Sequence, residues 1–289
     1  MSAPRNSRSS GAVMENRQDT LRTLLRQLNL GHISRTFAEV ALHAAKEGLT
    51  HEAFLYELVR LECEQRAQRR IERRRRRSGL PVEKTFRTLQ LARFPPPQRL
   101  QIEHLRDGTF VADAMNVIAL GRPGAGKSHV AAALGEELLL QGHTVLWTTT
   151  ATLVQQLLAA KRDLRLPQEL ARLERFACVI LDDLGYVQQD RSEMEVLFTF
   201  LADRYEHKSV IITTNLVFSE WDRIFKDPMT TMAAIDRVVH HAIILDLMAV
   251  ESYRVEEAQQ RRQGAALPHA SSPPAQAQEA PAAGSAPVG

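Results

Sequence analysis

The chain is poor in cysteine and aromatic residues, and it has no long apolar run. Cys63 and Cys178 are the two cysteines among 289 residues, and their separation fits neither a disulfide framework nor a zinc site. No stretch approaches the roughly 18 uncharged apolar residues of a membrane-spanning helix, and no apolar segment follows the N-terminal arginines as in a secretory signal. These absences predict a protein of the reducing cytoplasm. Cys178 lies in an apolar run, where we expect a small core residue.

Positive charge is concentrated in one part of the chain. The formal net charge is only +3, yet residues 60–106 hold 14 Lys and Arg against 5 Asp and Glu. Nine of the 18 residues from Arg60 to Arg77 are Arg. A basic block joined to a less basic remainder predicts that one part of the protein meets a polyanion.

Composition and apolar periodicity predict five parts. Residues 1–14 and 259–289 are small and polar, so we expect disorder at both ends. Residues 15–93 predict a helical domain whose first helix stops at Gly31, whose second spans about 32–47, and whose third follows Thr50 as N-cap. The consecutive prolines 95–97 predict an extended linker over 94–106. The expected buried face of the third helix consists of Phe54, Leu55, Leu58, Val59 and Leu61.

Residues 107–258 predict an α/β domain. Short apolar runs alternate with amphipathic helical patterns, which favours a parallel sheet covered by helices on both faces. The predicted strands are 116–120, 144–147, 177–181, 210–213 and 242–245. The predicted helices are about 127–141, 151–161, 168–175, 191–206 and 230–240.

Residues 121–128 fit the pattern G-x-x-x-x-G-K-[ST] at every fixed position, between a predicted strand and a predicted helix. Glycines allow successive N–H groups to point at phosphate oxygens, and the helix N-terminus adds partial positive charge. We therefore expect this loop to bind ATP, with Lys127 on the β- and γ-phosphates and the Ser128 hydroxyl on Mg²⁺. The expected nucleotide contacts are Gly121, Arg122, Pro123, Gly124, Ala125, Gly126, Lys127, Ser128 and His129.

Two further strands end in polar residues. The run that begins at Cys178 ends in Asp182 and Asp183, a pattern that is good turn chemistry by itself but predicts a Walker B element when it accompanies the loop. There Asp182 is expected to hold Mg²⁺ and Asp183 to orient or deprotonate the attacking water. The next strand ends at Asn215, expected to contact the γ-phosphate or that water, with Trp221 packed on the turn that presents it.

These segments carry a resemblance to a known family. The loop at 121–128, the segments 179–186 and 211–221, and the later segments 232–241 and 251–254 are similar to the IstB family. These are helper ATPases of bacterial insertion sequences, related to the helicase loader DnaC within the AAA+ superfamily. The arginine-rich helical region 49–77 also resembles the family, and the likeness covers roughly residues 18–256.

The resemblance implies roles for further residues. Asn215 matches the sensor-1 position, and Arg237 matches the arginine finger that reaches the ATP of a neighbouring subunit. Arg254 is similar in position to a sensor-2 arginine. The family lacks a separate helical lid and carries Asp where Asp183 stands, so the resemblance implies hydrolysis in a homo-oligomer.

The basic block is expected to bind duplex DNA without sequence preference. Guanidinium groups bind phosphate bidentately, and no aromatic residue lies within 60–85 to stack on single-stranded bases. A solvated helix end is the alternative, because arginine is also favourable near a helix C-terminus. The arginines cover most of a helix circumference, which suits a helix along a phosphate backbone or a flexible arm. The predicted DNA-binding residues are Arg69, Arg70, Arg73, Arg74, Arg75, Arg76 and Arg77.

The resemblance therefore implies a bacterial cytoplasmic ATPase that assembles on duplex target DNA with ATP and helps a cognate transposase. Three alternatives remain at this point. A replicative helicase loader of the DnaC type would grip a helicase and single-stranded DNA. A small-molecule P-loop kinase would need an acceptor pocket. A structural DNA-binding protein would keep this fold but no longer hydrolyse ATP.

Overall fold

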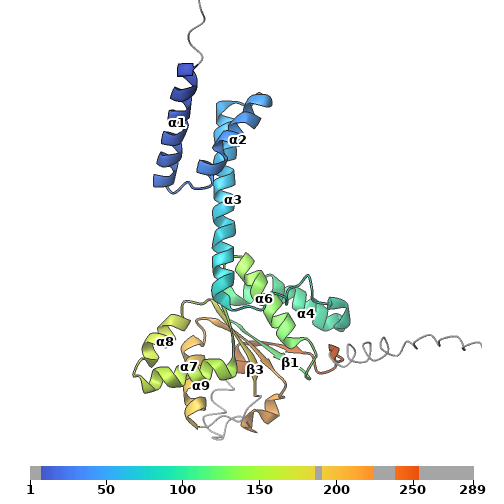
Figure 1. Cartoon of the computed structure of the whole chain (residues 1–289). Coiled ribbons are helices and arrows are strands. Elements are labelled where there is room, and N and C mark those ends of the chain that lie inside the picture. The colour runs from blue at the N-terminus through green and yellow to red at the C-terminus, as the bar shows by residue number, and fades with distance from the viewer. Residues whose placement is uncertain (1–7, 186–190, 224–237, 254–289) are drawn as a thin grey trace, which may run out of the picture.

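The computed structural model describes residues 8–185, 191–223 and 238–253. It consists of a helical part at the end of one long helix, α3, and an α/β body on which that helix stands (Figure 1). Among the described residues, every helix is too short or too polar to cross a bilayer.

The helical part contains α1 (Arg8–Gln27), α2 (Ile33–Lys46) and α3 (His51–Ser78). The Thr50 side chain caps α3 by accepting a hydrogen bond from the Ala53 amide at 3.2 Å, as the sequence predicts. Ile33, Phe37 and Leu58 form a small core between these helices. Of the predicted buried face of α3, Leu55 and Val59 are instead exposed, because three helices alone cover only part of the circumference of α3.

A buried carboxylate ties α2 to α3. Glu62 of α3 is 4% exposed and accepts hydrogen bonds from the amides of His32 and Ile33 at 2.8 and 3.0 Å. Burial alone would raise the pKa of Glu62, but the bonds from Ile33, Arg66 and His32 lower it below its ordinary value. Glu62 therefore caps α2 as a charged group, since the first amides of a helix have no partner within the helix.

The body is built on five parallel strands in the order β2-β3-β4-β1-β5. The strands are β1 (Asn116–Leu120), β2 (Val145–Thr149), β3 (Cys178–Leu184), β4 (Ser209–Thr214) and β5 (Ala242–Asp246). The order places β4 between β1 and β3. β1, β3 and β4 are the strands that precede the predicted phosphate-binding residues. Their carboxyl ends therefore lie side by side at one edge of the sheet.

Helices cover both faces of the sheet. The helices of the body are α4 (Pro96–Arg106), α5 (Thr109–Ala112), α6 (Lys127–Leu140), α7 (Thr150–Arg162), α8 (Leu166–Leu173) and α9 (Arg191–Arg204), with 3-10 helices η1 (Leu91–Arg93) and η2 (Phe218–Arg223). One apolar core lies under α4, α5 and α6 and a second under α7, α8 and α9. Cys178 is fully buried between β2 and β4, and burial raises the pKa of its thiol to about 12, as expected of a core residue.

Two predicted boundaries are wrong. The segment 94–106 is not an extended linker, because α4 begins at Pro96, and its Ile102 and Leu105 are buried in the core of the body. Proline is tolerated in the first turn of a helix, where its missing N–H has no partner anyway. Helix α1 begins at Arg8, within the segment expected to be disordered, because a helix once formed extends at little cost. Residues 259–289 and most of the predicted helix 230–240 lie outside the described residues.

Arg204 is a buried cation that joins three segments of the body. It is 1% exposed, and its guanidinium donates to the carbonyls of Leu173, Phe176 and Ser209 at 3.2, 3.0 and 3.0 Å. These bonds connect the end of α9 to the turn before β3 and to the start of β4. The guanidinium thereby finds buried acceptors in all three segments.

We expect Arg204→Met to lower the free energy of unfolding by about 3 kcal/mol, because it removes the buried hydrogen bonds that join these three segments. Urea unfolding followed by circular dichroism measures the change. Arg175→Met, at an exposed position, is the matched control and should change stability by less than about 0.5 kcal/mol. Equal stabilities of the two variants would contradict a stabilising role for Arg204.

Candidate functional site

The glycine-rich loop 121–126 joins β1 to α6, the strand-loop-helix context that its sequence predicts. Gly124 and Gly126 have φ angles of 86° and 88°, a region that favours glycine. A Cβ on Gly124 would lie 2.1 Å from Ser252 Oγ, and one on Gly126 would lie 3.2 Å from the Phe94 ring. The loop leads directly into the first turn of α6, and the N-terminus of a helix offers backbone amides to phosphate oxygens.

Lys127 lies at the start of α6 and is 7% exposed. Its ammonium group donates to the carbonyls of Gly121 and Arg122 at 2.8 and 3.0 Å. The loop therefore holds a cation within its own curve, beside the adjacent Ser128 hydroxyl. A buried cation at a helix N-terminus is well placed to bind an anion.

The two carboxylates at the end of β3 are held in different environments. Asp182 is 8% exposed, and its Oδ1 accepts a 2.6 Å hydrogen bond from Thr213 Oγ1 of β4. Asp183 is exposed and has a φ of 60°, where β3 bulges against β4. Its amide donates to the same Thr213 oxygen at 3.0 Å. Thr213 thus fixes the side chain of one acid and the backbone of the other.

Asn215 follows β4 and lines the same cleft as Lys127 and the two acids. Trp221 is 2% exposed and donates its indole N–H to the Leu216 carbonyl at 3.3 Å. The predicted packing of Trp221 on the turn that presents Asn215 is therefore confirmed. Arg237 and Arg254 lie outside the described residues.

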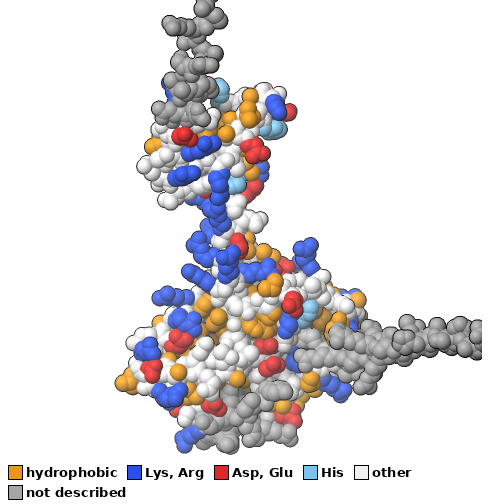
Figure 2. Space-filling view, viewed as in Figure 1, with side chains coloured by type: hydrophobic (Ala, Val, Ile, Leu, Met, Phe, Trp, Pro, Cys, Tyr) orange, Lys and Arg blue, Asp and Glu red, His pale blue; other side chains and the backbone are white. Residues whose placement is uncertain are grey.

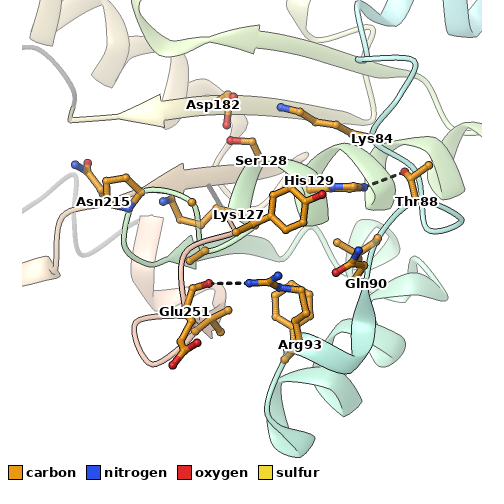
Figure 3. A pocket seen from close by; sticks show the side chains of 18 of the residues that line it. Lys84, Thr88, Gln90, Arg93, Lys127, Ser128, His129, Asp182, Asn215 and Glu251 are labelled. Carbon is orange, nitrogen blue, oxygen red and sulfur yellow. Dashed lines mark hydrogen bonds between the residues drawn. The ribbon is translucent and has the colours of Figure 1, made fainter. Parts of the chain in front are cut away.

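Residues 79–94, called the strap, form one wall of this cleft, which has a volume of about 680 Å³. Figure 3 shows Thr88, Gln90 and Arg93 of the strap on the side of the cleft away from Asn215. The strap was predicted to belong to the helical domain, but it packs on the body, because Leu80 and Phe94 are buried in the core there. No local sequence pattern marks this contact, since the partners of the strap are distant in the chain.

Three contacts attach the strap to the loop region. His129 Nε2 lies 3.1 Å from both the Thr85 carbonyl and Thr88 Oγ1. The guanidinium of Arg93 lies 5.0 Å from the centre of the Tyr253 ring, a distance at which cation and ring attract each other. Tyr253 in turn donates its amide to the Gly124 carbonyl at 3.1 Å. His129, predicted as a nucleotide contact, lines the cleft and also anchors the strap.

The residues present fit a magnesium nucleotide. Glycines form a curve that a Cβ would fill, and a buried ammonium lies at its end. Ser128 and Asp182 supply hydroxyl and carboxylate oxygens, the ligand types that Mg²⁺ prefers. The site therefore has the donors for phosphate and the ligands for a hard cation.

Comparison with known proteins agrees with this chemistry. The family model described as IstB-like ATP binding protein matches residues 23–262. The chain belongs to this family. A Sinorhizobium fredii protein described as an insertion sequence ATP-binding protein is 40% identical to this IstB-like chain over 248 residues, which are 86% of the chain and 83% of the relative. The ATP-binding protein of insertion sequence IS21 from Pseudomonas aeruginosa is 35% identical over 237 residues, 82% of the chain and 89% of the relative.

The fold of this IstB-like protein is that of the P-loop AAA+ proteins. Aquifex aeolicus DnaA, solved with AMPPCP, is similar with a TM-score of 0.50 at 15% identity, over 65% of this chain and 57% of that one. The predicted fold class and family are confirmed.

The structure separates the predicted DNA-binding arginines of the IstB-like chain into two groups. Arg75 faces the body, where its guanidinium pairs with Glu136 of α6 at 3.0 Å. Arg76 pairs with Glu72 of its own helix. The other predicted residues include Arg69, Arg70, Arg73 and Arg77, which are exposed along α3. That Arg75 binds DNA stays a prediction, and in this structure its guanidinium is paired with a carboxylate of the body.

We expect acid to weaken the attachment of the strap through His129. Burial lowers the pKa of His129 below its ordinary 6.5, the Thr85 bond opposes the shift, and the Lys84 charge adds to it. The unfolded chain then binds the proton more readily, so stability falls as the pH drops below 6.5. His129→Gln keeps an N–H donor and does not titrate, and should lose less stability between about pH 8 and about pH 5.5. Equal losses in urea unfolding of the two proteins would contradict this role.

Proposed function

We propose that this IstB-like protein is a DNA-stimulated ATPase that assembles on duplex target DNA and helps a cognate transposase. The observation that carries the proposal is the meeting of Lys127, Ser128, Asp182, Asp183 and Asn215 in one cleft at the carboxyl edge of β1, β3 and β4. Its insertion sequence relatives and the arginines of α3 support the DNA half of the proposal. The bacterial cytoplasm is the proposed location.

In the proposed site, each residue has a distinct role. Lys127 and the first amides of α6 bind the phosphates, and Ser128 and Asp182 hold Mg²⁺, which neutralises charge on the phosphates when bound. Thr213 keeps the Asp182 carboxylate in one orientation through its 2.6 Å bond. Asp183, more exposed, orients or deprotonates the attacking water, and Asn215 positions that water or the terminal phosphate.

Arg237 is proposed to complete the site of a neighbouring subunit. An arginine finger supplied in trans is worth on the order of 10³–10⁵ in rate in other phosphoryl-transfer systems. An isolated subunit would then hydrolyse ATP slowly, and assembly on DNA would switch hydrolysis on. ATP binding favours the assembled state and hydrolysis releases it, because the two nucleotide states differ in affinity for DNA.

A helicase loader of the DnaC type is the second candidate. The exposed arginines of α3 without interleaved aromatic residues favour duplex over single-stranded DNA. A transposase gene beside this gene, and preference for duplex in binding assays, would support the first candidate.

We expect Lys127→Ala to weaken ATP binding at least about tenfold, because it removes charge-assisted bonds to the phosphates. Asp183→Asn should bind ATP normally, hydrolyse it about 10²-fold or more slowly and keep the protein assembled on DNA. Calorimetry, phosphate release and sedimentation with duplex DNA measure the three properties.

The matched control for the second variant is Asp163→Asn, at an exposed site on the α7–α8 connection. It should hydrolyse ATP at the wild-type rate. Wild-type turnover by Asp183→Asn would contradict the role of Asp183. A wild-type protein that ignored ATP in calorimetry would overturn the proposed function itself.

Mixing two inactive variants tests the arginine finger. Arg237→Ala and Asp183→Asn should each lose activity, Arg237→Ala by on the order of 10³-fold. Mixed on duplex DNA, they should regain activity, since Asp183→Asn subunits bind ATP, assemble and supply Arg237 to the intact sites of Arg237→Ala subunits. An equal mixture of Arg237→Ala and wild-type subunits calibrates the gain. No gain in the mixture of variants would show that Arg237 acts within its own subunit or not at all.

A further inference from the structure

Residues 66–77 of α3 form a narrow neck between the helical part and the body. Residues of α1 and α2 pack on the first half of α3 and the body packs on its last turn. Figure 2 shows Lys and Arg side chains gathered along this neck between the helical part and the body. From Arg66 to Arg77 the neck rises about 16 Å, at about 1.5 Å per residue.

Five arginines of the neck share one face of α3. Positions 66, 69, 70, 73 and 77 are separated by three or four residues, and such positions lie on the same side of a helix. Arg75 lies on the opposite side, against Glu136. The sequence predicts arginines around most of the circumference of α3. The structure instead divides them between an exposed basic face and a face that packs on the body.

The exposed basic face is hollowed beside the turn between α1 and α2. Asn29 of that turn, with Arg66, Arg69, Arg70 and Arg73 of α3, lines a notch of about 490 Å³. Arg66 donates to the Asn29 carbonyl at 2.6 Å and to Glu62 at 2.9 Å. Arg66 therefore fixes the turn against α3, and the other three arginines are left to line the notch.

Three of the four arginines that line this notch have no carboxylate partner among the described residues. Across residues 8–185, 191–223 and 238–253, Arg69, Arg70 and Arg73 each lack an acidic partner within ion-pair distance, whereas Arg60, Arg66, Arg75 and Arg76 each have one. Like charges held together repel each other, and a polyanion relieves that repulsion. Guanidinium forks match phosphate oxygens bidentately, and a neutral amide such as that of Asn29 also bonds to phosphate.

We propose that this notch is a phosphate-binding site for the backbone of duplex DNA, with Arg69, Arg70 and Arg73 as its cationic ligands and Asn29 as a neutral one. Arg66 is a positioning residue that builds the notch. Arg75 and Arg76 lie outside the site, because each is already paired. The inference rests on the proposed DNA binding and deepens it, since it assigns the contact to one face of α3.

Phosphate contacts have a measurable signature in salt. The logarithm of the binding constant for duplex DNA falls with the logarithm of salt concentration in proportion to the number of phosphates neutralised. The slope of the logarithm of the binding constant against the logarithm of salt concentration should become shallower by about 2 when two phosphate-binding side chains are removed. Binding should weaken equally for DNA duplexes of unrelated sequence. Binding of the full chain to two unrelated duplexes is to be measured by fluorescence anisotropy over a series of salt concentrations.

The test compares two variants with the same change of net charge. Arg69→Gln/Arg73→Gln alters the notch, and Arg162→Gln/Arg175→Gln removes two exposed arginines of the body. Gln is a good helix former, so α3 is expected to remain intact, and thermal unfolding checks this. The notch variant should show the flatter salt dependence and at least about tenfold weaker binding at moderate salt, while the body variant should match the wild type.

Equal losses in the two variants would overturn the inference, because net charge alone would explain them. Wild-type binding by the notch variant, with the wild-type salt dependence, would also overturn it and would leave the proposed function standing. Absence of salt-dependent duplex binding by the wild-type protein would instead remove the DNA half of the proposed function, and this inference with it.

Discussion

The pairing of β4 between β1 and β3 is the constraint on which the candidate site depends. Parallel strands deliver their carboxyl ends to one edge, so the loop after β1, the acids of β3 and Asn215 after β4 lie around one cleft. Thr213 makes the pairing chemically specific, because one hydroxyl bonds both to Asp182 and to the amide of Asp183. The bulge of β3 turns Asp183 outward while Asp182 stays buried, and adjacent acids can therefore serve different roles.

The strap connects the nucleotide cleft to the long helix physically. It leaves α3 at Gly79, crosses His129 and reaches Phe94, whose ring lies against Gly126. A shift of the loop or of the start of α6 would therefore meet the strap directly. Such contiguous packing is the kind of path by which occupancy of one site can alter another, provided that the strap has two arrangements.

The neck of α3 divides one run of arginines between a side that packs on the body and an exposed side. Helical periodicity directs Arg75 to the body, where Glu136 receives it, and directs Arg69 and Arg73 to the opposite side. The paired arginine joins the last turns of α3 to α6. The arginines without a carboxylate partner among the described residues keep their charge for the proposed DNA, so that position on the helix, more than composition, separates the paired arginine from the proposed binding ones.

The sequence by itself determined the strand-loop-helix at 116–140, the acids after a buried strand and the alternation that builds the sheet, because these depend on local pattern and on spacing along the chain. It also carried the family resemblance, through the loop and the segments around Asp183 and Asn215. Only the tertiary structure decided that Pro96–Arg106 forms a packed helix, that the strap walls the cleft, and that Arg75 meets Glu136 of the body. Those outcomes depend on partners such as Glu136, Gly126 and His129, which are distant in the chain and which no local pattern can supply.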